Sequence, residues 1–129
     1  MNRTKFMAEV HEKLIRSVVN NLERKGYTVQ ADHINHPNGK PEECMGHSPD
    51  IRAIRGLKEI LVEVETCDTV LFNHEHKWRR FSYRPDTKFY VIVPCNCKEK
   101  AEIKKKIMNL PVEIRCGDLQ WGKLEDFEF

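Results

Sequence analysis

Apolar side chains recur every three or four positions between residues 5 and 25, and Gly26 follows the last of them. This spacing places them on one face of an α-helix, and a glycine directly afterwards is typical of a helix C-terminus. The apolar stripe consists of Phe6, Val10, Leu14, Val18 and Leu22, widened by Met7, Ile15 and Val19. We therefore predict an amphipathic helix over residues 5–25.

The rest of the chain alternates between strand-like and helix-like patterns. Alternating or continuous apolar segments predict strands over residues 27–34, 49–54, 59–66, 88–93 and 111–116. Helical spacing predicts helices within residues 69–83 and over residues 98–110. This order, α-β-β-β-α-β-α-β, predicts an α/β fold in which helices flank a mixed β-sheet. With 129 residues, the chain suits a single domain over residues 1–129.

A tight turn is predicted between the second and third strands. Gly56 and Leu57 form a two-residue loop with glycine at its first position, which is typical of the type II′ turn that joins antiparallel strands. Arg55 then pairs with Lys58. Each residue before Arg55 then pairs with the corresponding residue after Lys58, so the turn fixes the register of the hairpin.

This register predicts a cluster of carboxylates at the far end of the hairpin. Asp50 lies directly opposite Glu63, with Cβ atoms about 4.5–5.5 Å apart, and Glu65 is one diagonal step away on the same face. Like charges that face each other destabilise a hairpin, so we expect a hard divalent cation such as Mg²⁺ to neutralise them. Without metal, replacing Asp50 is expected to relieve repulsion and stabilise the protein.

The acidic strand has a second interpretation as a half-exposed strand. In this interpretation its glutamates alternate with buried residues and are neutralised by Arg52 or Arg55. However, Leu61 and Ile54 share the face of the acids, which favours a face that is partly covered.

Composition and charge restrict the function less than the pattern does. The chain has 22 basic and 20 acidic residues, and its net charge of +2 neither requires nor excludes a nucleic-acid partner. No segment approaches the roughly 18 consecutive apolar residues of a membrane-spanning helix. The five cysteines show no disulfide framework, although Cys95 and Cys97 are close. We therefore expect free thiols, a cytoplasmic protein and no membrane partner.

The acidic motif resembles that of the PD-(D/E)xK nuclease superfamily, the restriction endonuclease-like proteins. Pro49 and Asp50 precede a short strand, and Glu63-Val64-Glu65 follows an apolar lead-in. By element order, the resemblance covers about residues 10–116. It implies metal-dependent cleavage of DNA, with Mg²⁺ or Mn²⁺ bound by Asp50, Glu63 and the backbone carbonyl of Val64. Glu65 stands where the family usually has lysine, a variant (ExE) that resembles some restriction endonucleases.

Three further residues are candidates for this site. Lys77, in the helix after the motif, is a candidate replacement for the missing lysine, or else an ordinary solvated residue. Related nucleases often carry an acid on the first helix, where Glu12 lies at the border of the apolar stripe and is our choice. His11 lies near the centre of the stripe and is a secondary candidate, with a core histidine as the alternative.

Two other groups of residues suggest binding. The loop that contains His33, His36, Cys44 and His47 could hold zinc, although its spacing differs from that of known zinc fingers, and a mobile loop is the alternative. The predicted second helix and its exit concentrate the cations Lys77, Arg79, Arg80 and Arg84, interleaved with Trp78, Phe81 and Tyr83. Such a surface can bind nucleic acid, unless the aromatic residues belong to the core.

The sequence thus predicts a metal-dependent endonuclease that hydrolyses phosphodiester bonds of DNA. Its site would consist of Asp50, Glu63 and Glu65, with Glu12 and either Lys77 or His11. A homodimer that cuts two strands is compatible with the small size. The alternative is a catalytically inactive protein of the same fold that binds nucleic acid or serves as a scaffold, because the motif lysine is absent.

Overall fold

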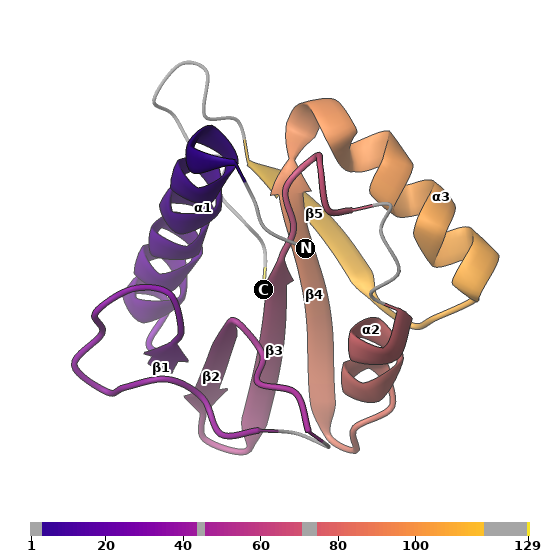
Figure 1. Ribbon diagram of the computed structural model, residues 1–129. Coiled ribbons are helices and arrows are strands. Elements are labelled where there is room, and N and C mark those ends of the chain that lie inside the picture. The colour runs from indigo at the N-terminus through magenta and orange to yellow at the C-terminus, as the bar shows by residue number, and fades with distance from the viewer. Residues whose placement is uncertain (1–3, 44–45, 71–74, 118–128) are drawn as a thin grey trace.

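The computed structural model describes residues 4–43, 46–70, 75–117 and 129. Its strands are β1 (Thr28–Ala31), β2 (Ile51–Arg55), β3 (Lys58–Val64), β4 (Thr87–Pro94) and β5 (Glu113–Gly117). Its helices are α1 (Lys5–Arg24), α2 (Glu75–Ser82) and α3 (Lys98–Met108), with a short 3₁₀ helix, η1 (Cys95–Cys97). Figure 1 shows α1 on one side of the sheet and both α2 and α3 on the other. The predicted α/β class, a mixed sheet flanked by helices, is confirmed.

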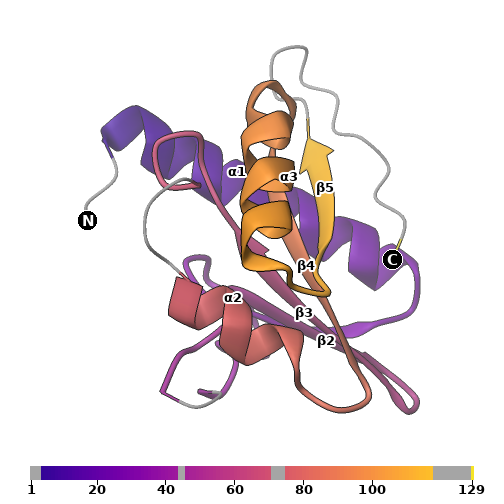
Figure 2. The ribbon, with the colours of Figure 1, turned by 90° about the vertical axis from the view of Figure 1, so that its right-hand side faces the viewer.

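The strands form one sheet in the order β1-β2-β3-β4-β5. β1, β2 and β3 pair antiparallel, whereas β3, β4 and β5 pair parallel, each parallel connection passing through a helix. The C-terminal ends of β3, β4 and β5 therefore lie side by side at the same end of the sheet. Figure 2 shows α2 and α3 lying over the strands on the face opposite to α1.

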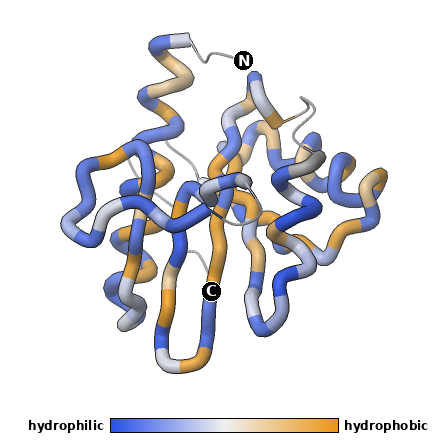
Figure 3. The backbone as a smooth tube through the Cα atoms, turned by 60° about the horizontal axis from the view of Figure 1, so that its bottom comes forward, coloured by the Kyte–Doolittle hydropathy of each residue, from blue (hydrophilic) through white to orange (hydrophobic). Residues whose placement is uncertain are grey.

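A hydrophobic core lies on each face of the sheet. On the first face, α1 packs Leu14, Val18 and Leu22 of its apolar stripe against alternate residues of the strands, whereas Phe6, near the start of the helix, is exposed. On the second face, Trp78 and Phe81 of α2 pack with the other set of alternate residues, including Val91. Figure 3 shows hydrophobic segments in the central strands and hydrophilic ones in the surrounding loops. Both faces of β4 are covered, which explains its continuous apolar sequence.

Residues 69 and 70, at the start of the range predicted for the second helix, are not helical. They lie in a turn, because the amides of Thr69 and Val70 both donate to the carbonyl of Thr66. The described helix α2 spans Glu75–Ser82, within the predicted range. Leu71 and His74, which the helical spacing included, lie outside the described residues. The first strand is also shorter than predicted, and a left-handed backbone at His33, with φ of 66°, follows shortly after its end.

The cysteines correct the expectation of free thiols. Disulfides join Cys67 to Cys97 and Cys95 to Cys116. The chain separations of 30 and 21 residues gave no recognisable framework. The pairs meet because parallel neighbours bring the ends of β3, β4 and β5 together, with Cα–Cα separations of 5.6 and 4.8 Å that suit a disulfide. Cys44 lies outside the described residues.

None of the helices in the described ranges has the length and apolar character needed to cross a membrane.

Candidate metal centre

The acidic cluster is built by the hairpin register that the turn predicts. The structure pairs Arg55 with Lys58 and Ile51 with Val62, and Gly56 has the positive φ of 61° that a type II′ turn needs at this position. One step beyond the last pair, the amide of Asp50 donates to Oε1 of Glu63 at 3.1 Å. The predicted juxtaposition of Asp50 and Glu63 is therefore present.

Both carboxylates are buried and are held by the backbone. Asp50 is 6% exposed and Glu63 is 2% exposed. The amide of Val64, at the end of β3, donates to Oδ2 of Asp50 at 2.8 Å. Each of the two acids therefore accepts a hydrogen bond from a backbone amide of the neighbouring segment. Such bonds offset part of the cost of removing a charge from water.

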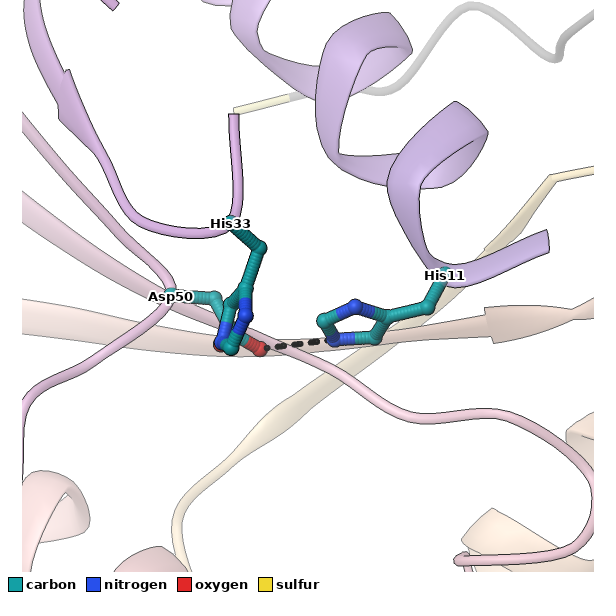
Figure 4. A group of neighbouring side chains, drawn as sticks. All are labelled: His11, His33 and Asp50. Carbon is teal, nitrogen blue, oxygen red and sulfur yellow. Dashed lines mark ion pairs between the residues drawn. The ribbon is translucent and has the colours of Figure 1, made fainter. Parts of the chain in front are cut away.

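Two histidines from different elements contact Asp50. Nε2 of His11, on α1, lies 3.5 Å from Oδ2, and Nε2 of His33, in the loop after β1, lies 3.2 Å from Oδ1. The two imidazole rings meet edge to face with centroids 5.0 Å apart. Figure 4 shows both rings directed at the Asp50 carboxylate. His11 is buried, whereas His33 is exposed and forms the solvent side of the group.

These contacts determine the charge state of Asp50. Burial by itself would raise the pKa of the Asp50 carboxyl. Hydrogen bonds from His11 and His33, the electrostatic effect of His11 and the bond from Val64 outweigh burial and hold the pKa below its ordinary value. Asp50 is therefore ionised at neutral pH.

Glu63 is in the opposite situation. Burial raises the pKa of its carboxyl well above the ordinary value, and the negative charges of Asp50 and Glu65 raise it further. The positive charge of Lys77 and the amide of Asp50 act in the other direction without compensating. Without a cation, the buried charge of Glu63 is thus poorly compensated.

Glu65 belongs to the same buried cluster and is held by the turn that follows it. Its Oε2 accepts a hydrogen bond from Oγ1 of Thr69 at 2.7 Å. Thr69 is in turn bonded to Thr66 through both its amide and its hydroxyl. Glu65 and Thr69 are 3% and 2% exposed, so this arm of the cluster is fixed within the protein.

The ligand atoms of His11, His33 and Asp50 are close enough to share one ion. All of them lie within 4.8 Å of one another. Imidazole nitrogen and carboxylate oxygen are ligands that Mn²⁺ and Zn²⁺ both accept, whereas Mg²⁺ prefers oxygen. Among the described residues, Glu63 is not a member of this group, and its contact with Asp50 is through the backbone amide of that residue.

The first helix presents a different residue from the one preferred by sequence. Glu12 is exposed and pairs with Arg16 at 3.6 Å on the outer side of α1. His11, the secondary candidate, is the residue of this helix turn that faces the site. One residue advances about 100° around a helix, so these neighbours cannot both face inward.

The predicted nucleic-acid cations lie in different surroundings. Lys77 is half-buried and acts electrostatically on Glu63. Arg79 is exposed, Arg80 reaches the backbone near Gly46, and Arg84 bonds to Glu59 at 2.9 Å. Trp78 and Phe81 are fully buried in the core, as the alternative interpretation held, and Tyr83 is exposed.

The predicted zinc loop contributes its histidines to separate contacts. His33 contacts Asp50, whereas Nε2 of His36 lies 3.4 Å from Glu23 on α1. His47 is half-buried in the described part of the loop, and Cys44 lies outside it. The spacing of His33 in the sequence suggests only a zinc ligand, and no local signal connects this residue with Asp50. The β1–β2 register, in which Ala31 faces Ile51, brings them together.

Neither the protein-family models nor the curated proteins contain a match to this chain. The geometry of the site and the resemblance of its short acidic motif are therefore what indicate a function.

Proposed function

We propose that this protein is a metal-dependent nuclease with a restriction endonuclease-like core, which hydrolyses phosphodiester bonds of DNA with Mg²⁺ or Mn²⁺. The observation that carries the proposal is the buried pair of Asp50 and Glu63, joined by the hydrogen bond from the Asp50 amide. Two adjacent buried acids, only one of which is well compensated, favour a cation as the missing partner.

The residues of the site would have different roles. Asp50 and Glu63 would bind the metal with the carbonyl of Val64, and His11 and His33 hold the Asp50 carboxylate in place and can themselves bind an ion such as Mn²⁺. A bound ion of this kind lowers the pKa of a water molecule and neutralises charge on a phosphate. The exposed position of His33 marks the side on which substrate approaches.

Lys77 is the candidate for the cation that the motif lacks at Glu65. Its charge acts on Glu63 from α2, a different element from the usual motif position. Lys77→Met should lower the cleavage rate roughly 100- to 1000-fold, the range for a lost donor to a charge that develops in the transition state. Lys88→Met removes an equal charge from an exposed position on β4 and should cleave as wild type does. Equal rates for the two variants in single-turnover assays would contradict the role of Lys77.

The proposal is tested by cleavage of supercoiled plasmid DNA. Wild-type protein should nick or linearise the plasmid in Mg²⁺ or Mn²⁺ and should leave it intact in EDTA. The double variant Asp50→Asn/Glu63→Gln should be inactive under every condition, while Glu99→Gln, on the exposed surface of α3, should retain activity. Equal cleavage by wild type and the double variant would show that the activity is not that of this site.

The same experiment separates the alternative function. A protein that binds the plasmid in a gel-shift assay but never cleaves it, with any of the metals, would be a nucleic-acid-binding or scaffold protein on a nuclease-like fold. The glutamate at position 65 motivates this alternative, since it removes the usual cation from the motif.

A further inference from the structure

The Cys67–Cys97 disulfide lies close to the acidic cluster along the chain. Cys67 lies two residues after Glu65, inside the turn in which Thr69 holds the Glu65 carboxylate. Its partner Cys97 ends η1, which follows β4. β3 and β4 are parallel neighbours, and the amide of Glu65 continues their pairing by donating to the carbonyl of Ile92 at 2.9 Å.

The turn itself is short and depends on a few contacts. Thr66 donates its amide to Oγ1 of Thr69 at 3.1 Å, and the amide of Val70 donates to the carbonyl of Thr66. The Val70 side chain is buried in the core of the second face, and the disulfide is the covalent anchor on the other side of the turn. Glu65 thus receives its hydrogen bond from a residue that lies between these two anchors.

The two cysteines of this disulfide differ in their exposure. Cys67 is half-buried at the surface, whereas Cys97 is 1% exposed. Thiol–disulfide exchange requires in-line access to one sulfur, so Cys67 is the atom that a thiol can attack. The Sγ of Cys67 lies 3.4 Å from Oδ1 of the exposed residue Asn96, on the solvent side of η1.

We propose that Cys67 is a thiol-exchange site and that its disulfide to Cys97 positions Glu65, the third acid of the buried cluster, so that a dithiol reductant weakens the metal centre. This inference rests on the proposed function. One thiolate of the dithiol attacks Sγ of Cys67 and releases the Cys97 thiolate. The second thiol then closes the cyclic disulfide of the reductant and releases Cys67. Two electrons and two protons pass to the protein in total.

The second disulfide provides a matched control. Cys95–Cys116 closes a loop of similar length and joins the end of β4 to β5, so neither of its cysteines lies in the turn of Glu65. Loop-closure entropy varies slowly with loop length, and the two pairs should therefore affect global stability to a similar degree. A difference in metal affinity between Cys67→Ser/Cys97→Ser and Cys95→Ser/Cys116→Ser then results from where the disulfide lies and not from a loss of global stability.

The test measures Mn²⁺ affinity by calorimetry in the full chain. Oxidised wild type and Cys95→Ser/Cys116→Ser should bind equally, whereas Cys67→Ser/Cys97→Ser should bind about tenfold more weakly, in the range seen when a ligand-orienting contact is lost. Wild type reduced with dithiothreitol and then desalted without air should bind as weakly. Unchanged affinity in Cys67→Ser/Cys97→Ser, or an equal loss in both variants, would overturn the inference.

Amide hydrogen exchange supplies a readout that needs no metal. In Cys67→Ser/Cys97→Ser, the amides of Thr66 and Val70 should exchange faster than in the control variant, because the turn has lost its covalent anchor. Equal exchange would overturn the inference even if no metal binds. Failure of oxidised wild type to bind Mn²⁺, with faster exchange in the variant, would instead count against the proposed function.

Discussion

Glu63→Gln should stabilise the metal-free protein while abolishing the proposed metal-dependent cleavage. The folded protein raises the pKa of this buried carboxyl well above its ordinary value of 4.5. The folded state therefore holds a proton that the unfolded chain releases, and stability falls as the pH rises from about that ordinary value through the raised pKa. Above this range, the full penalty of a buried charge beside Asp50 and Glu65 is present.

The side chain of glutamine carries no charge, but it keeps an oxygen that can accept the hydrogen bond from the backbone amide of Asp50. At pH 8 in EDTA, Glu63→Gln should raise the free energy of unfolding by about 1–3 kcal/mol, since one pKa unit corresponds to about 1.4 kcal/mol. Urea unfolding between pH 5 and 8 measures both the gain and the flatter pH dependence of the variant. Glu12→Gln, at an exposed position, controls for the loss of one acid. A less stable Glu63→Gln protein at pH 8 would contradict this account of the site.

Asp50→Asn should have the opposite effect on stability. The sequence suggested that removing Asp50 would relieve repulsion, but in the structure its carboxylate accepts from Val64 and contacts His11 and His33. Hydrogen bonds to a charged group contribute about 1.5–3 kcal/mol each. We therefore expect Asp50→Asn to lower the free energy of unfolding in EDTA at pH 6 by about 2 kcal/mol.

The pH dependence of this loss has a definite sign. Because the folded protein lowers the pKa of Asp50, its stabilising contribution is present above the ordinary value of 3.8 and is lost as the pH falls below it. The difference between wild type and Asp50→Asn should accordingly shrink in acid, as unfolding curves between pH 2.5 and 6 will show. A difference that stays constant over this range would mean that Asp50 is not held as an ion.

The proposed cleavage should fall at least about 100-fold in Asp50→Asn, because the loss of a ligand to a catalytic ion would cost several kcal/mol of transition-state stabilisation. The midpoint of thermal unfolding should also lose its response to Mn²⁺, since a ligand stabilises only the state that it binds. Retained cleavage with an unchanged Mn²⁺ response would remove Asp50 from the metal centre.

The sequence by itself determined the hairpin and the acids that it brings together. A type II′ turn at Gly56 allows one pairing between its strands, so local turn geometry was enough to place Asp50 opposite Glu63. Periodicity was likewise enough for α1 and for the covered strand β4, because side-chain direction repeats regularly along a helix or strand.

Only the tertiary structure decided which other residues join these acids. His33 is separated from Asp50 by a long loop, and its position follows from the pairing of β1 with β2, which no local signal specifies. The disulfides depend in the same way on parallel strands connected through helices. The choice of His11 over Glu12 depended on the rotation of α1 against the sheet. Each of these contacts joins residues far apart in the chain, and their energies come from packing between elements rather than from the sequence within one.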